Sequence, residues 1–260
     1  MKKLLLITLA FLFAVSVNAQ QKKDSVRVKN KTSEIKKGNV GILNQADRIV
    51  FDIFSDIWMN APTDSMTIKK VNRGADFYLM KEFPFGKSNF SFALGLGVGC
   101  TNLYSNSTPV KSFTIDSLGA KAYDGKTVFT KIPSFSPDGK QDIHFKNNKF
   151  TLIYLDIPLE FRYRMRNNAF KVYLGGKVGL TLSNHTKYNG DDYNENYPTG
   201  NIRIKEYKIA NVQKYRYGLT ARIGWKWIQV YGYYSLSKLF KKDLGPDMYP
   251  ISVGLTISPY

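Results

Sequence analysis

The sequence predicts an all-β protein, an eight-stranded antiparallel up-and-down transmembrane β-barrel. Three observations predict this fold: an N-terminal export signal, a hydropathy period of two from residue 48 onward, and connections that alternate between long and short. A period of two is typical of strands, because successive side chains of a strand point to opposite faces. The 260-residue chain is long enough for one such domain and a short extension.

The N-terminus predicts export. Lys2 and Lys3 precede an apolar run over residues 4 to 17, and small residues follow up to Ala19. This pattern indicates a signal peptide over residues 1–19, since the run is shorter than the roughly 20 apolar residues that cross a bilayer as a helix. The only cysteine is Cys100, so the sequence excludes a lipidated cysteine next to the signal and any disulfide within the chain.

Residues 20–47 are expected to form a flexible, basic periplasmic segment before a barrel that spans residues 48–260. Residues 21 to 47 hold seven Lys or Arg against three acids, in a polar context. The whole chain carries a formal charge of +18. Export argues against nucleic acid as a partner, and anionic lipid headgroups are the more accessible one.

The strands are placed by their alternation. Phe90, Leu94 and Val98 fall on one face of a strand while small residues such as Gly95 and Gly97 fall on the other. The same pattern predicts eight strands, at Arg48–Trp58, Arg73–Phe83, Asn89–Tyr104, Phe150–Arg164, Phe170–Leu182, Tyr215–Gly224, Trp227–Ser237 and Met248–Ile257. Connections are short at residues 84–87 and 165–168, and longest at Ser105–Lys149. Short periplasmic turns opposite long outer loops are typical of outer-membrane barrels.

The period alone does not say which face is outside, so a soluble barrel of lipocalin type is the alternative. Glycines on the second face favour the membrane barrel, because Gly95, Gly97 and Gly99 would make room inside a narrow eight-stranded interior. Hydrocarbon offers no partner for backbone groups, so such a sheet must close. Aromatic side chains are expected at both membrane boundaries, with Phe83, Phe85, Phe90, Tyr163, Trp225 and Trp227 on the periplasmic side and Trp58, Tyr104, Tyr234 and Tyr249 on the outer side.

The inward face carries balanced charge. Six acids, Asp52, Asp56, Asp76, Glu82, Asp156 and Glu160, face six bases, Arg162, Arg164, Lys171, Lys177, Arg216 and Arg222. Buried charges are tolerated when they are paired, so we expect a filled, salt-bridged interior. The alternative function for this set is a narrow, ion-selective pore.

Further positive charge gathers where the outer loops join the strands. The residues are Lys69, Lys70, Arg73, Lys146, Lys149, Lys205, Lys208, Lys214, Lys238, Lys241 and Lys242. This basic collar is expected to bind outer-membrane lipid through lipopolysaccharide phosphates. The alternative is that these are ordinary solvated loop lysines.

No catalytic, cofactor-binding or metal site is predicted, and no cofactor. His144 and His185 are placed in loops, with Asp142 and Ser183 two residues away, but this spacing supplies no third catalytic group. The acidic segment 190–196 matches no calcium-loop spacing and is taken as a solvated loop. The alternative is a lipid-modifying barrel enzyme that uses a histidine at the rim.

One strand resembles a known family. The segment Tyr154-Leu155-Asp156-Ile157-Pro158-Leu159-Glu160-Phe161-Arg162-Tyr163 is similar to the aromatic-x-[Asp/Glu]-Ile-Pro-Leu signature of PorT-like outer-membrane β-barrels, and residues 48–58 and 73–102 fit that family's opening. The resemblance covers most of residues 48–260. It implies a barrel in a Gram-negative outer membrane, and some members of the family resemble parts of protein-secretion machinery.

The chain departs from simple barrel rules at two points. Pro158 lies within a strand, where it removes a ladder hydrogen bond, so we expect a bulge there. The C-terminal Tyr260 resembles the signal for the barrel-assembly machinery, but Ser258 and Pro259 break the alternation before it. Recognition by that machinery is expected to depend on Ile251, Val253, Leu255 and Ile257.

The functional expectation is a non-enzymatic integral outer-membrane protein whose barrel anchors and displays four outer loops. The Ser105–Lys149 loop is the expected contact surface for a protein partner, because loops of that length in a compact fold are usually functional or disordered. A role as an accessory component of an export complex is a further alternative.

Overall fold

The computed structural model describes residues 48–115, 121–137, 139, 141–165, 169–193 and 201–258. The chain divides into two units, residues 1–38 and 39–260, and the described residues all belong to the second. The expected signal peptide and basic N-terminal segment therefore lie outside the described residues. Within the described ranges no helix is long and apolar enough to cross a membrane.

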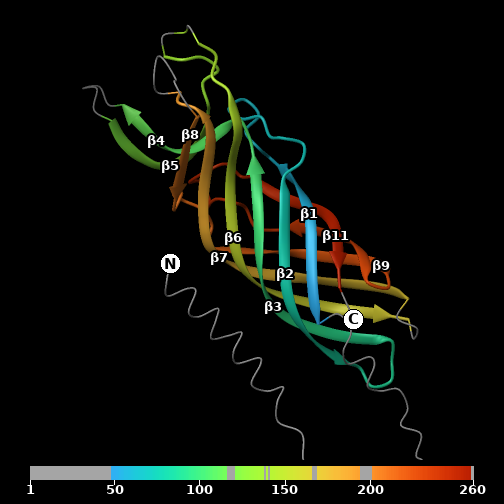
Figure 1. The fold of residues 1–260 in the computed structure, drawn as a ribbon. Coiled ribbons are helices and arrows are strands. Elements are labelled where there is room, and N and C mark those ends of the chain that lie inside the picture. The colour runs from blue at the N-terminus through green and yellow to red at the C-terminus, as the bar shows by residue number, and fades with distance from the viewer. Residues whose placement is uncertain are drawn as a thin grey trace, which may run out of the picture. The chain divides into compact units, whose positions relative to one another are not determined.

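Eight strands form the closed antiparallel barrel that the sequence predicts (Figure 1). They are β1 (Ile49–Met59), β2 (Arg73–Pro84), β3 (Phe90–Tyr104), β6 (Phe145–Arg164), β7 (Phe170–Asp191), β9 (Tyr215–Trp225), β10 (Ile228–Ser235) and β11 (Tyr249–Ile257). The order is β6-β3-β2-β1-β11-β10-β9-β7, and pairing of β6 with β7 closes it. Each barrel strand thus has a partner on both sides, which satisfies the backbone without water.

The two faces of the wall differ as the membrane barrel requires. On β1, Ile53 is 50% exposed while its neighbour Asp52 is 0% exposed. Leu94 on β3 and Leu174 on β7 are exposed, whereas Lys177 is buried. Bulky apolar side chains face outward and charged ones face inward, so the soluble barrel with an apolar interior is excluded.

Glycines on the inward face make room for the charged interior, as expected. A Cβ atom added to Gly99 would lie against Arg216, Asp76 and Asp156, and one added to Gly179 would also meet Asp156 and Arg216. These positions admit no side chain because the ion pairs occupy the space.

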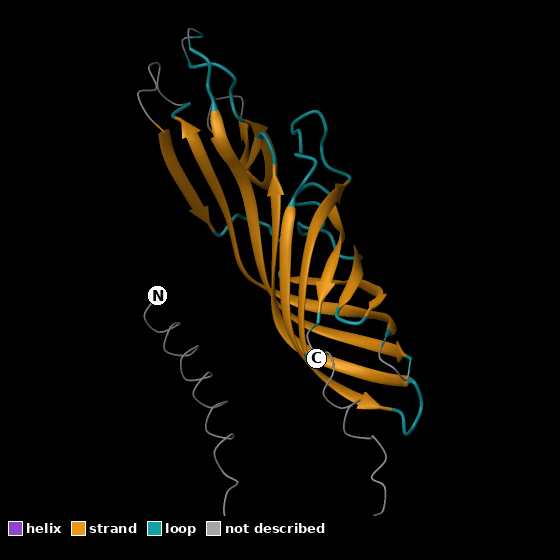
Figure 2. Ribbon diagram, turned by 45° about the vertical axis from the view of Figure 1, so that its right-hand side comes forward, coloured by secondary structure: helices purple, strands orange, loops and turns teal. Residues whose placement is uncertain are grey.

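Three further strands were not expected. β4 (Ser107–Ile115) and β5 (Lys121–Lys131) form a separate hairpin, so Ser105–Lys149 is not the plain loop that the sequence suggested. β8 (Asn201–Tyr207) pairs with the outer end of β7. β6 begins five residues before, and β7 ends nine residues beyond, the boundaries read from the sequence. Figure 2 shows these strands projecting beyond one end of the barrel.

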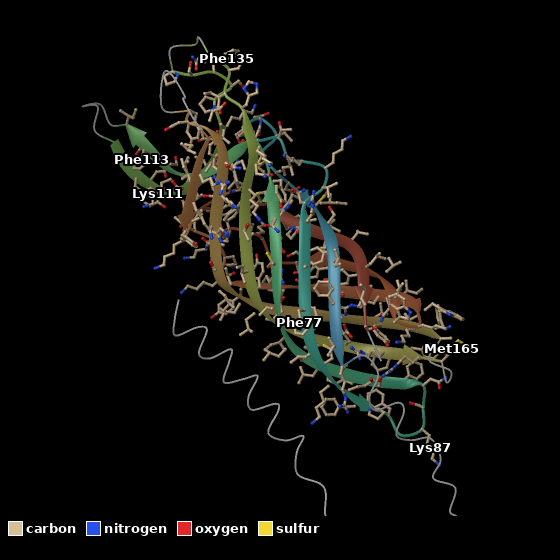
Figure 3. All side chains as sticks on the ribbon, viewed as in Figure 1. Phe77, Lys87, Lys111, Phe113, Phe135 and Met165 are labelled. Atoms are coloured by element: carbon tan, nitrogen blue, oxygen red, sulfur yellow. The ribbon has the colours of Figure 1, made fainter. Side chains whose placement is uncertain are left out.

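The two ends of the barrel differ in the length of their connections. Figure 3 places Lys87 and Met165 at one end and Lys111, Phe113 and Phe135 at the other. The first end carries the short turns and the second carries the added strands. By the rule for outer-membrane barrels, the second end faces the cell exterior.

The expected bulge at Pro158 is wrong. Pro158 pairs in register with Lys177 on β7, and the register shift in β6 lies at Ile153 and Tyr154. Toward β3 the pairing skips Pro158 and resumes at Asp156 opposite Gly97 without a shift. The missing N–H is accommodated on the β3 side, where Gly95 leaves space for the proline ring.

Most of the aromatic side chains expected at the periplasmic boundary face outward near the short turns, and those expected at the outer boundary do so only in part. Trp225, Trp227, Phe83, Phe85 and Phe90 are exposed near the short turns. Tyr234 and Tyr249 contact each other at 5.8 Å between ring centroids on the outer side. Placing Trp58 there was wrong, because it is 8% exposed and points inward. It shares the parity of Asp52 and Asp56, so strand alternation places all three inside.

Candidate functional site

The centre of the interior is an ion-paired network. Lys177 Nζ lies 2.6 Å from Asp76 Oδ2 and also donates to the hydroxyls of Tyr78 at 3.2 Å and Tyr231 at 3.1 Å. Arg216 donates from Nε to Asp156 Oδ1 at 3.0 Å, and its Nη2 lies 3.7 Å from Asp76 Oδ1. β2, β6, β7, β9 and β10 each supply at least one member of the network, so it joins strands across the barrel.

A second network fills the periplasmic half. Arg222 Nη2 lies 2.6 Å from Asp52 Oδ2, and Thr256 Oγ1 donates to Asp52 Oδ1 at 2.5 Å. Arg162 Nη2 lies 2.7 Å from Glu160 Oε2. Arg222 also pairs with Glu160, and Arg164 pairs with Glu82. The predicted salt-bridged interior is confirmed for these pairs, whose side chains are buried, whereas Asp56 accepts a hydrogen bond from the Ser252 hydroxyl instead.

Aromatic rings complete the packing around the cations. The guanidinium carbon of Arg216 lies 3.7 Å from the centroid of Tyr154, and that of Arg222 lies 5.0 Å from the centroid of Tyr231. Lys177 Nζ is 4.3 Å from the centroid of Tyr233. A cation over an aromatic face is stabilised further when water is excluded.

An apolar cluster closes the outer mouth of the barrel. Phe129 comes from β5, Met66 from the loop after β1 and Phe240 from the loop after β10. Phe240 contacts Phe129 and Phe150 at ring-centroid distances of 6.0 and 6.5 Å. The outer loops therefore seal the barrel, which does not favour the narrow-pore alternative.

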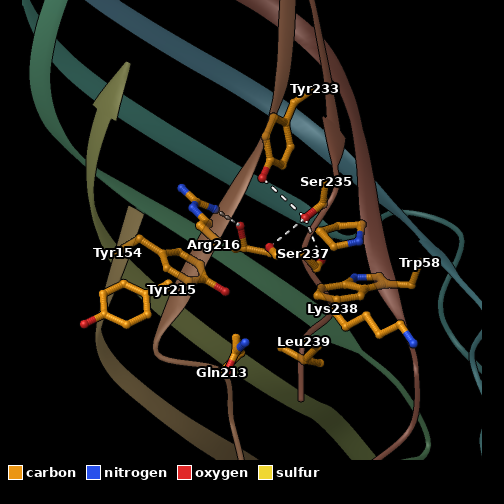
Figure 4. Close-up of a pocket in the computed structure, with 12 residues that line it drawn as sticks. Trp58, Tyr154, Gln213, Tyr215, Arg216, Tyr233, Ser235, Ser237, Lys238 and Leu239 are labelled. Atoms are coloured by element: carbon orange, nitrogen blue, oxygen red, sulfur yellow. Dashed lines mark hydrogen bonds between the residues drawn. The ribbon is translucent and has the colours of Figure 1, made fainter. Parts of the chain in front are cut away.

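One small cavity lies beneath this seal (Figure 4). Its volume is about 20 Å³, and Trp58, Tyr154 and Arg216 are among the residues that line it. Ser235 accepts a hydrogen bond from the Tyr233 hydroxyl at 3.4 Å and contacts the Ser237 hydroxyl at 3.3 Å. A space of this size holds about one water molecule, so it is too small for a substrate.

The two histidines lie in different surroundings, and only one of them is in a loop as the sequence suggested. His144 is in a loop, as expected, and its backbone N–H donates to Asp191 Oδ2 at 2.9 Å. His185 is not in a loop but in the extended part of β7, against the ring of Tyr207 at 5.4 Å. Along the paired strands, His185 is opposite Thr151, whereas His144 precedes Phe145, which is opposite Gly190.

The acidic segment after β7 gives no metal site in the described part of the chain. Asp191 is engaged by the backbone of His144, and residues 194–196 lie outside the described residues. Among the described residues no group of three or more His, Cys, Asp or Glu side chains could hold a metal ion. Burial, together with the neighbouring Asp191, raises the pKa of Tyr188 to about 12.

The structure gathers part of the basic collar onto one wall. Lys69, Arg73 and Lys149 line one groove together with Lys187, which the sequence analysis had not singled out. Lys205 lies beside Lys187 on the neighbouring strand. Lys238 instead pairs with Asp247 at 2.5 Å. Simple alternation of β7 beyond Leu182 would have placed Lys187 on the inward face, because the register shift opposite Ile153 and Tyr154 exchanges the two faces of the strand.

A closed eight-stranded barrel with an apolar outer wall, an ion-paired interior and a sealed mouth defines a small integral membrane barrel. The chain belongs to the outer membrane protein beta-barrel domain family, whose family model matches residues 9–241. This membership implies an outer-membrane location. No curated protein and no solved structure matches the chain.

Proposed function

We propose that this protein is a non-enzymatic outer-membrane anchor that presents an outer platform for binding a protein partner. The platform consists of β4, β5, β8 and the outer ends of β6 and β7. The observation that carries the proposal is that a filled, sealed barrel carries outside it a structured hairpin with several exposed apolar side chains.

The β4–β5 hairpin has the surface of a binding element. Phe113, Ile115 and Tyr123 are exposed on it, and Ile115 is 67% exposed. Exposed apolar groups that cluster on one element are typical of protein-binding surfaces. Beside it lies a groove of about 590 Å³ that β4 and the β8 end line together, including Val110 and Tyr207.

The hairpin is also anchored to the loops below it. Thr127 on β5 donates its backbone N–H to Leu244 O at 2.9 Å and its hydroxyl to Ala210 O at 3.1 Å. Asn211 Nδ2 donates to Gly125 O at 2.7 Å. Anchoring lowers the entropy lost on binding, which supports a preformed contact surface.

A photo-crosslinking amino acid at Phe113 in living cells tests this proposal. We expect one protein adduct from Phe113, lost when Ile115 and Val110 are both changed to Ser. The matched control places the same amino acid at Lys87, on the opposite end, where that adduct should not form. The absence of an adduct at Phe113 and at Tyr123, or the same adduct from Lys87, contradicts the proposal.

Non-enzymatic character has its own test. Mass spectrometry of lipid A from cells with the wild-type protein, His185→Ala or His144→Ala should give one identical pattern. An acylation pattern that changes with either histidine would instead favour the lipid-modifying enzyme.

The resemblance to PorT-like barrels supports placing the partner within an envelope or secretion complex.

A further inference from the structure

A row of lysines crosses the outer wall above the barrel. Lys149 on β6 lies directly opposite Lys187 on β7, and Lys187 lies directly opposite Lys205 on β8. Side chains directly opposite one another in antiparallel strands have Cβ atoms about 5 Å apart, and like charges in such pairs are destabilising. An anion bound beside these three lysines would relieve that repulsion.

The row belongs to the face that meets lipid. Lys149 lies on the same face of β6 as Ile153 and Ile157, because an even number of positions separates them. This is the outward face, since Ile153 is opposite Cys100 on the outward face of β3. The outward apolar residues end at Ile153 on β6 and Leu182 on β7, which we take as the outer limits of those two membrane-spanning segments. The lysines thus continue the lipid-facing wall beyond the hydrocarbon.

The height of the row suits lipid headgroups. A strand rises about 3.3 Å per residue, so Lys149 lies about 13 Å along the tilted strand beyond Ile153. Lysine stems bend toward an interface and keep the ammonium at the polar level. Between the lysine row and the last outward apolar residues of β6 and β7 lie Thr151, His185 and Tyr207, which are neighbours across β6, β7 and β8.

Nearby carboxylates do not neutralise the row. Lys149 Nζ donates to Asn102 Oδ1 at 3.0 Å, and Lys205 Nζ lies 4.6 Å from the centroid of Tyr207. Within the described residues, none of Lys149, Lys187 and Lys205 forms an ion pair with a carboxylate. Burial and the three lysines lower the pKa of His185, which indicates that their charges converge at this point.

A groove beside the row adds two further cations. Its volume is about 330 Å³, and Lys69 and Arg73 line it together with Lys149 and Lys187. Tyr104, which pairs with Lys149 across β3 and β6, also lines it. Arginine and lysine together offer both forked and single-point donors for phosphate oxygens.

We propose that the groove and the row Lys149–Lys187–Lys205 bind the phosphates of a glycolipid in the outer leaflet. The acyl chains of that lipid would lie on the apolar wall formed by residues such as Ile153, Ile157 and Leu180. Continuity between the basic row and the apolar wall favours a phosphorylated amphiphile over a free anion. This lipid site lies on strands that also contribute to the partner-binding platform proposed above, but it is inferred from different residues, the lysine row and its groove.

Binding of lipid A to the protein in nanodiscs made of uncharged lipid tests the proposal. The probe is lipid A with both phosphates, compared with dephosphorylated lipid A and with inorganic phosphate. Each lysine near an anionic surface contributes about fivefold, so Lys149→Gln, Lys187→Gln and Lys205→Gln together should weaken binding by about 100-fold. The matched control, Lys238→Gln with Lys241→Gln and Lys242→Gln, should change it less than threefold.

The gel mobility of unboiled samples checks that each variant folds. If the triple variant does not fold, Lys187→Gln alone is measured instead, and we expect it to weaken binding about fivefold. Equal losses in both triple variants, or none in the row variant, would overturn the proposal. Lipid A that binds as tightly without its phosphates would also overturn it. Inorganic phosphate that binds as tightly as lipid A would show a free-anion site and contradict the lipid assignment.

Discussion

Lys177 Nζ lies 2.6 Å from Asp76 Oδ2 at the centre of the barrel, although 101 residues separate the two in the chain. Lys177 is on β7 and Asp76 is on β2, so the ion pair crosses the interior between non-adjacent strands. Removing one partner of a buried pair leaves an uncompensated charge, which is more harmful than removing both.

Lys177→Met is therefore expected to lower the free energy of unfolding by about 3–5 kcal/mol. Urea unfolding of the detergent-solubilised protein, followed by gel mobility without boiling, measures this loss. Lys87→Met, at an exposed turn, should change stability by no more than about 0.5 kcal/mol. Equal stability of the two variants would contradict the ion-paired interior.

Gly99 and Gly232 are both glycines within barrel strands, but an added side chain would be crowded at the first and free at the second. Gly99→Ala places a Cβ atom against Arg216, Asp76 and Asp156, so it should destabilise the barrel by about 1–3 kcal/mol through overpacking. At Gly232 the nearest atom to an added Cβ is the backbone oxygen of Ala221 at 4.0 Å. Gly232→Ala should be neutral or slightly stabilising in the same unfolding assay. A larger loss at Gly232 than at Gly99 would argue against a filled interior.

The barrel could be predicted from the sequence because its wall separates two environments. Lipid on one side and ion pairs on the other impose strict alternation, and this alternation located all eight barrel strands and the twelve inward charges. β4, β5 and β8 lie outside the closed barrel, where no lipid or ion-paired interior imposes a strict alternation. Residues such as Ser112 and Lys126 there carry no comparable pattern, so the strands were missed.

The placement of Trp58 has a direct spectroscopic consequence. The chain has three tryptophans, of which Trp225 is 57% exposed on the wall while Trp58 is 8% exposed. In proteins that keep one tryptophan each, lipids with brominated acyl chains should quench Trp225 and Trp227 and leave Trp58 nearly unquenched. Strong quenching of Trp58 would return it to the outer aromatic boundary.

His185 should report the charge of the lysine row. Burial first, and then Lys205, Lys149 and Lys187, lower the pKa of His185 below its usual value. NMR titration should find this lowered pKa, and Lys187→Gln should raise it toward the usual value. Because the folded pKa lies below the unfolded one, this histidine favours folding at high pH, and that contribution is lost as pH falls through the folded pKa. A pKa above about 6.5 in the wild-type protein would contradict the arrangement.

The candidate site was predictable in its residue types and only partly in its assembly. The collar lysines were visible at the strand ends, but pairing of β8 with β7 brings Lys205 beside Lys187, and no local pattern specifies that contact. Likewise, the sequence placed Lys238 in the collar, but in the structure it forms an ion pair with Asp247. Long-range pairing, rather than local propensity, decides which charges remain available to a ligand.

The orientation of the wall is tested most directly by spin labels on neighbouring positions of β7. In a Cys100→Ser background, a label at Leu174→Cys in liposomes should be highly accessible to oxygen, which concentrates in hydrocarbon, and poorly accessible to a water-soluble nickel complex. Tyr173→Cys, which points into the packed interior, should resist labelling in the folded barrel. A label at residue 174 that is shielded from both reagents, with residue 173 reactive in the folded protein, would contradict the account.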